Sequence, residues 1–124
     1  MLNHIVIMGR LTAAPELRYT QQGTAVASYT LAVDRDYQSG GNEKQTDFIP
    51  CVAWRQSAEF VSKYFSKGSM AVVSGRLQLR DWTDKDGNKR RTAEVIAESV
   101  YFGESKKREP GQLEELEDDG ELPF

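Results

Sequence analysis

The chain has 124 residues and a net formal charge of −3 at pH 7, which suits one domain with a buried core and a short tail. Its single cysteine, Cys51, excludes an internal disulfide and favours a reducing compartment. No apolar run approaches the roughly 20 residues of a membrane span, and the N-terminus lacks the basic flank of a signal peptide. The sequence therefore predicts a soluble, cytoplasmic protein.

Basic and acidic side chains are separated along the chain. All 16 Lys and Arg residues lie at or before Arg108, so residues 1–108 carry 16 basic and 12 acidic groups, a net charge of +4. Residues 109–124 carry seven acidic groups and no basic one. A mildly basic body suits a polyanion, and an acidic tail suits either a basic partner or the body's own basic surface.

The first apolar segment, residues 4–11, is rich in β-branched side chains and short enough to be a strand. Gly9 within it suggests a bulge or a bend. The next residues, 12–23, have turn chemistry at Pro15 and Gly23, which predicts a connecting segment.

A second strand is expected at about residues 24–33. Residues 34–45 are too polar for a core and contain a Gly-Gly pair at 40–41, which predicts the turn of a long hairpin. The arms of this hairpin would carry Arg35 and Tyr37.

Residues 46–54 form the third expected strand, and a period of two gives it two different faces. One face is small and apolar, as a core requires, and consists of Ile49, Cys51 and Ala53. The other carries two large rings, Phe48 and Trp54, about 20 Å apart at about 3.3 Å per residue. Both rings fit either a barrel core or a binding surface. Pro50 between them favours an edge or a bulge, because proline gives the sheet no N–H.

The spacing of apolar residues becomes helical over residues 55–67, where one stripe comprises Phe60, Val61, Tyr64 and Phe65. Gly68 fits a left-handed stop after this helix. We expect the stripe to seal one end of a small sheet.

Residues 69–82 alternate over an unusually long run. The apolar face comprises Ala71, Val73, Leu77 and Leu79. The opposite face is cationic and ends in a tryptophan, and it comprises Arg76, Gln78, Arg80 and Trp82. A hairpin built on Asp86 and Gly87 follows, and a fifth strand is expected at about residues 92–102.

Three strands, a helix and two more strands, in this order, are typical of the OB-fold, a five-stranded Greek-key barrel that binds oligonucleotides or oligosaccharides. The sequence thus predicts an all-β protein with one short helix. The barrel is expected at residues 1–103, a short disordered linker at 104–117, and an acidic tip at 118–124.

Sequence-tolerant binding of single-stranded nucleic acid needs cations that follow the phosphates and flat rings on which unpaired bases stack. The body offers both, interleaved along the expected strands and hairpins. The expected stacking rings are Tyr37, Phe48, Trp54 and Trp82. The expected phosphate contacts are Arg10, Arg18, Arg35, Arg55, Lys67, Arg76, Arg80 and Arg90. Each cation taken alone also fits an ordinary solvated face.

The sequence gives little support to catalysis. His4 is the only histidine and has no cysteine near it, so neither a zinc site nor a Cys-His or Ser-His-Asp arrangement can be assembled. Asp34, Asp36 and Asp47 fit a metal ion for nuclease chemistry, but acids also ordinarily cap and solubilise hairpins. With no Walker-type phosphate loop, we expect a non-enzymatic protein without a metal or a cofactor.

Residues 104–124 are too charged to fold alone, and they end in an apolar tip after an acidic run. A small apolar plug flanked by negative charge can dock in a pocket ringed by Lys and Arg. The expected partner-binding residues are Asp118, Asp119, Glu121, Leu122, Pro123 and Phe124.

Several stretches together resemble the bacterial single-stranded DNA-binding proteins, which coat unwound DNA in replication, recombination and repair. They are residues 3–11 (NHIVIMGRL), 15–19 (PELRY), 23–27 (GTAVA), 46–48 (TDF), 64–69 (YFSKGS), 80–84 (RDWTD) and 118–124 (DDGELPF). The resemblance implies an OB-fold, a homotetramer and base stacking on the four rings given above, of which Tyr37 is commonly tryptophan in relatives. It also implies a nucleoid-associated location and a tip that recruits replication, recombination and repair proteins.

The linker departs from the family, because many relatives have a long Gly-, Gln-, Asn- or Pro-rich segment where this chain has about 15 residues. A short linker admits a specialised role, such as protection of DNA taken up in transformation, or a phage or plasmid origin. From the residues alone, an RNA-binding OB module of the translation apparatus stays open as an alternative.

Overall fold

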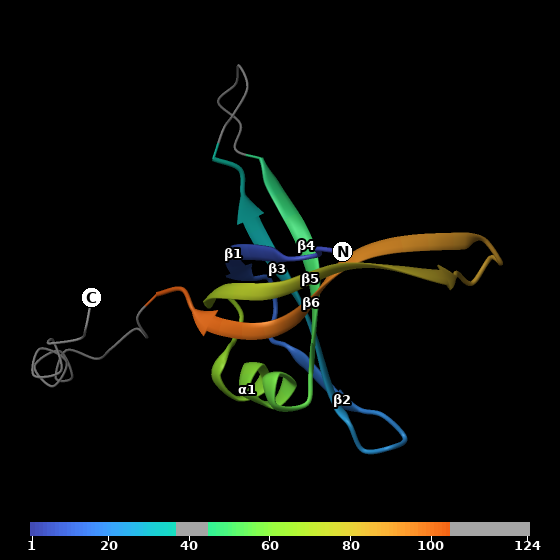
Figure 1. Cartoon of the computed structure of the whole chain (residues 1–124), viewed down its shortest axis with the longest axis horizontal. Helices are drawn as coiled ribbons and strands as arrows, with labels where there is room; N and C mark the ends of the chain where they lie inside the picture. The colour runs from blue at the N-terminus through green and yellow to red at the C-terminus, as the bar shows by residue number, and fades with distance from the viewer. Residues whose placement is uncertain (37–44, 105–124) are drawn as a thin grey trace, which may run out of the picture.

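The computed structural model describes residues 1–36 and 45–104, so Tyr37, the expected 40–41 turn and the tip at 118–124 lie outside the described residues. The elements, in chain order, are β1 (Ile5–Leu11), β2 (Glu16–Tyr19), β3 (Ala25–Asp34), β4 (Thr46–Trp54), α1 (Gln56–Tyr64), β5 (Met70–Thr83) and β6 (Lys89–Phe102) (Figure 1).

The sheet closes on itself into a barrel. The strand order is β1-β5-β6-β4-β3-β2, and β1 also pairs with β3 through Arg10–Ala32 and Leu11–Leu31. Strands β4 and β6 run parallel, whereas the other pairs are antiparallel. Helix α1 lies at one end of the barrel (Figure 1). This arrangement confirms the predicted OB-fold.

The barrel interior is filled by small and β-branched side chains. The period of two predicted for residues 46–54 is present in β4, where Cys51 and Ala53 are buried and Ile49 packs against the core. The largest fully buried side chains are Leu31, Val61, Val73, Val95 and Cys51. Burial raises the pKa of the Cys51 thiol to about 12, so this cysteine stays protonated and acts as a small core residue.

Helix α1 is shorter than the predicted 55–67 and ends at Tyr64. The predicted apolar stripe is partly wrong, because Tyr64 is exposed whereas Val61 and Phe65 are buried. Phe102 of β6 stacks on Phe65 at a ring distance of 4.7 Å and so supplies an aromatic contact that the helix spacing alone could not show. The predicted left-handed glycine lies beyond the helix end, at Gly68 with φ 89°.

One local prediction in the first third of the chain is wrong. The segment expected to be a connection contains β2, which pairs with β3 from Glu16–Ser28 to Tyr19–Ala25. Of the bulge or bend predicted at Gly9, the bulge is excluded, since β1 continues through it with regular β5 pairing. Glycine is needed there because a Cβ would collide with the Ala32 carbonyl oxygen of β3.

The predicted apolar face of residues 69–82 is only half right. Ala71 and Val73 are buried, but Leu77 and Leu79 are exposed. The β5–β6 pairing shifts register between Ser74 and Gly75, and the hairpin beyond this point projects from the barrel (Figure 1). Among the described residues, strand β4 pairs with β6 only at residues 95–97, so beyond Leu77 the arm is two-stranded and has no interior in which Leu79 could be buried.

Candidate nucleic-acid interface

Three of the four predicted stacking rings can be placed, and all three are open to solvent. Phe48 is 65% exposed, Trp54 is 43% exposed and Trp82 is 41% exposed. Phe48 and Trp54 lie on the same face of β4, six residues apart, as the period of two predicts. The alternative that these rings fill the barrel core is therefore wrong.

Trp54 lies in a groove of about 560 Å³ between the β2–β3 turn and the first turn of α1. The neighbouring Arg55 adopts φ 60°, a left-handed conformation that is costly for arginine. Its backbone N–H donates to the Ala25 carbonyl oxygen at 2.8 Å, which holds this conformation at the helix start. The groove is lined by Gly23, Thr24, Ala25, Trp54, Arg55, Gln56, Ser57 and Glu59.

Trp82 lies in a second groove, of about 590 Å³, on the β5–β6 arm. Three cations line this groove together with the ring, and the lining comprises Asp81, Trp82, Thr83, Lys89, Arg90 and Arg91. The Trp82 indole Nε1 donates a hydrogen bond to Thr92 Oγ1 at 2.8 Å. Arg90 Nε donates to Asp84 Oδ2 at 2.8 Å, and this hydrogen bond lowers the pKa of Asp84.

A third groove, of about 330 Å³, connects the two strands that carry these rings. It is lined by Pro50 and Val52 from the ring-bearing face of β4 and by Arg80, Thr92 and Glu94 from the arm. Glu94 is 6% exposed, and its Oε1 accepts from Arg80 Nε at 3.3 Å. The faces that the sequence predicts separately for residues 46–54 and 69–82 thus meet in one depression.

The remaining predicted cations hold polar contacts around the barrel. Arg35 Nε and Nη2 donate to the two Asp47 carboxylate oxygens at 3.0 and 2.9 Å, which lowers the pKa of Asp47. Arg18 Nη2 donates to Ser28 Oγ at 3.1 Å. Exposed ion pairs of this kind contribute little to stability, so a phosphate can compete with the carboxylate for the guanidinium. Of the other predicted cations, Arg55, Lys67 and Arg76 lie on the exposed surface.

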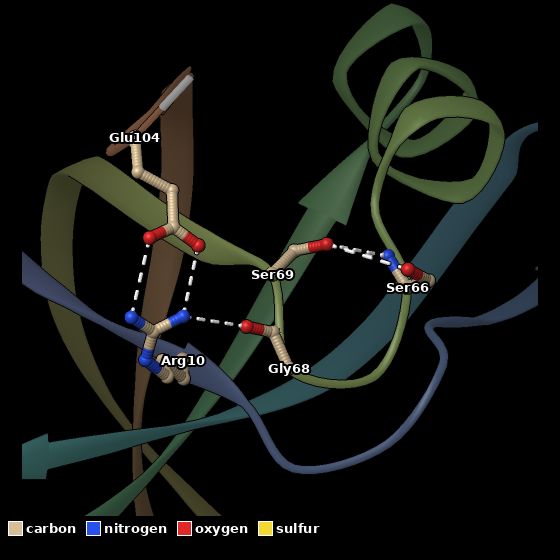
Figure 2. A network of polar contacts seen from close by, with 5 residues as sticks. All are labelled: Arg10, Ser66, Gly68, Ser69 and Glu104. Carbon is tan, nitrogen blue, oxygen red and sulfur yellow. Dashed lines mark hydrogen bonds and ion pairs between the residues drawn. The ribbon is translucent and has the colours of Figure 1, made fainter. Parts of the chain in front are cut away.

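Arg10 makes an ion pair as exposed as that of Arg35. Its guanidinium makes a two-pronged ion pair with Glu104, at 2.8 and 3.2 Å, and donates to the Gly68 carbonyl oxygen at 2.9 Å (Figure 2). The Arg10 hydrogen bond lowers the pKa of Glu104. Arg10 thereby links Glu104, just beyond β6, to the turn after α1. It lines none of the three grooves described above.

Sequence reasoning missed Thr92 and Glu94, which hold Trp82 and Arg80. The turn signal alone would not have found them, because a two-residue turn on Asp86 and Gly87 would place residue 80 opposite residue 93. The observed register differs by one residue and places residue 80 opposite residue 92, which brings Thr92 and Glu94 to the predicted cationic face.

Within residues 1–36 and 45–104, no group of three or more His, Cys, Asp or Glu side chains is arranged to hold a metal ion. The same part of the chain contains no helix long and apolar enough to cross a membrane.

An OB-fold barrel with exposed rings and cations along surface grooves is typical of proteins that bind single-stranded nucleic acid. Residues 2–103 match the family model described as "Single-strand binding protein family". The chain therefore belongs to the single-strand binding protein family.

Named relatives show the same similarity. The chain is 50% identical over 111 residues to single-stranded DNA-binding protein 3 of Listeria innocua, covering 90% of this chain and 69% of that protein. It is 51% identical over 106 residues to single-stranded DNA-binding protein 2 of Listeria monocytogenes, covering 86% of this chain and 66% of the relative. It is also 51% identical over 106 residues to single-stranded DNA-binding protein A of Bacillus subtilis, covering 86% of this chain and 62% of that protein. The chain thus spans about two thirds of the length of these curated relatives.

Proposed function

We propose that this chain binds and protects single-stranded DNA without sequence preference and without catalysis, in the cytoplasm where replication, recombination and repair expose such strands. Phe48, Trp54 and Trp82 stack on bases, while Arg55 and Arg80 contact phosphates. The observation that carries this proposal is the groove that joins the ring-bearing face of β4 to the cationic face of the β5–β6 arm. Further contacts are proposed for Tyr37, Arg10, Arg18, Arg35, Lys67, Arg76 and Arg90.

A fluorescence titration tests this proposal. Adding oligo-dT is expected to quench the emission of Trp54 and Trp82, because a stacked base changes the surroundings of the indole. The emission should recover as salt is added, since counterions released from the DNA make such binding salt-dependent. An unchanged signal would contradict the proposal, and tighter binding to a matched oligo-rU would favour an RNA-binding module. Cleavage of the strand in the presence of Mg²⁺ would favour a nuclease.

We also propose that the chain assembles into a homotetramer through the β1 side of the barrel. Strand β1 pairs with β3 only at Arg10 and Leu11, which leaves its edge from Ile5 to Gly9 unpaired among the described residues. Exposed apolar side chains also lie on this face, where Met8 and Tyr101 are exposed and the partly buried Val72 between them is the register partner of both. An unpaired edge beside an apolar face supports pairing with a second copy.

Replacing Met8 with glutamate is expected to lower the mass of the assembly, because a charge would be buried between copies. Light scattering measures this mass directly. Leu79→Glu is a matched control, since Leu79 is 57% exposed and Met8 is 55% exposed, but Leu79 lies on the β5–β6 arm. Equal masses for both variants and the unchanged chain would refute assembly through β1.

Residues 118–124 are proposed to recruit replication, recombination and repair proteins, with residues 104–117 as the linker. The support is the sequence itself, an acidic run followed by Leu122, Pro123 and Phe124. Deleting residues 122–124 is expected to abolish pull-down of such partners and to leave DNA affinity intact or raised. The control variant replaces two other leucines of the acidic tail, Leu113 and Leu116, with alanine. Partner binding that survives the deletion would rule out this role.

A further inference from the structure

Thr92 accepts a hydrogen bond from the indole N–H of Trp82, which is the only polar group of that side chain. The Nε1–Oγ1 distance is 2.8 Å, near the ideal for a hydrogen bond between nitrogen and oxygen. Thr92 is the register partner of Arg80, and Trp82 is that of Arg90, so this bond crosses the ladder diagonally. Because threonine is branched at Cβ, its χ1 angle is restricted and its hydroxyl forms a fixed point.

A second diagonal hydrogen bond lies two residues further along the same two strands. Arg80 Nε donates to Glu94 Oε1 at 3.3 Å, and Glu94 is the register partner of Gln78. Arg80 and Trp82 of β5 thus each donate a hydrogen bond to the β6 residue two positions beyond their direct register partner. The face that β5 offers to DNA is therefore set by side chains of β6.

We propose that Thr92 is a positioning residue that presents Trp82 for base stacking and makes this contact indifferent to the identity of the base. This inference rests on the proposed function, because it assumes that Trp82 stacks on DNA. The indole has one hydrogen-bond donor and no acceptor, and Thr92 occupies that donor. Trp82 can then offer a base only the face of its ring, and every base has a π-face to stack on it.

The same hydrogen bond lowers the desolvation cost of stacking a base on Trp82. A base that covers the ring also takes water away from the indole N–H, and an unpaired N–H in a dry contact is unfavourable. In this structure the N–H is already paired within the protein, so stacking leaves no donor unsatisfied. Thr92 also lines the groove that joins β4 to the arm, so the residue that accepts the Trp82 hydrogen bond lies in that groove.

Four proteins test the inference: the unchanged chain and the variants Trp82→Ala, Thr92→Val and Thr92→Ser. Their affinity for dye-labelled oligo-dT is measured by fluorescence anisotropy at one fixed salt concentration. Thr92→Val keeps the shape of the side chain but removes the acceptor, and it is expected to weaken binding about 3- to 10-fold, the effect of one lost hydrogen bond. Thr92→Ser keeps the hydroxyl and is expected to restore most of the affinity.

A second measurement reports ring position without DNA. In a Trp54→Phe chain Trp82 is the sole tryptophan, and its steady-state emission anisotropy should fall with Thr92→Val because the released ring moves more freely, but not with Thr92→Ser. Circular dichroism confirms that each variant is folded. If Trp82→Ala weakens binding but Thr92→Val matches Thr92→Ser in both measurements, the inference is overturned and the proposed function stands. If Trp82→Ala itself binds as the unchanged chain does, stacking by Trp82 fails, and the inference fails with it.

Discussion

Replacing Trp54 with alanine is expected to weaken oligo-dT binding by about 1 to 3 kcal/mol, or roughly 5- to 150-fold, which is the range for losing one base–aromatic stack. Trp54 is 43% exposed, so part of the ring is held by its surroundings while part stays available. A ring that is already fixed loses little entropy when a base stacks on it. Anisotropy titrations at constant salt measure the change, since the phosphate contribution depends on salt concentration.

Two controls separate stacking from general damage. Trp54→Phe keeps an aromatic face and should recover much of the affinity. Tyr64→Ala removes another exposed aromatic, on α1, that lines none of the three grooves, and it should bind as the unchanged chain does. If Trp54→Ala binds no worse than Tyr64→Ala, base stacking in the β2–β3 and α1 groove is refuted.

The outward placement of Phe48 and Trp54 on β4 could be predicted because the period of two in a strand is local information. Cys51 and Ala53 had to face the core, and this choice alone puts Phe48 and Trp54 outside. The order of strands and helix was also enough to predict the barrel, because few topologies accommodate it.

What the sequence did not predict has a common physical cause, which is contact between residues far apart in the sequence. Arg10 stays a predicted phosphate contact, but its ion pair with Glu104, 94 positions away, could not be foreseen from the strand pattern. Leu77 and Leu79 were assigned to the core because alternation looked the same on both sides of Gly75. Neither the ion pair nor the register shift leaves a local pattern in the sequence.

The register shift depends on Gly75. The β5–β6 partners change from Ser74–Ser99 to Gly75–Ala97, so Glu98 of β6 is passed over. A β-bulge of this kind bends the strand and increases its twist, and the arm that carries Trp82 begins at this point. Gly75 is buried, and a Cβ built on it would collide with the backbone carbonyl of Ile96.

Gly75→Ala is accordingly expected to lower the free energy of unfolding by about 1 to 3 kcal/mol, the usual cost of overpacking a tightly packed site. Backbone atoms of the neighbouring strand cannot turn aside as a flexible side chain can, so β6 must shift and the arm must tilt with it. Urea titration followed by circular dichroism measures the stability. Oligo-dT binding by the folded fraction reports the orientation of the arm. We expect both to fall together, because Arg80 and Trp82 lie beyond the bulge.

Ser74→Ala is the matched control, one residue earlier in the same strand and on the other side of the register shift. It removes a hydroxyl without adding an atom, and its effect on stability should stay within about 0.5 kcal/mol. Equal urea midpoints for Gly75→Ala and Ser74→Ala would show that the two strands do not approach as closely as the structure has them. A loss of stability in Gly75→Ala with full oligo-dT affinity would instead separate the bulge from the orientation of the arm. The joint loss is expected because the close approach of Gly75 to the Ile96 carbonyl lies at the register shift that sets the direction of the β5–β6 arm.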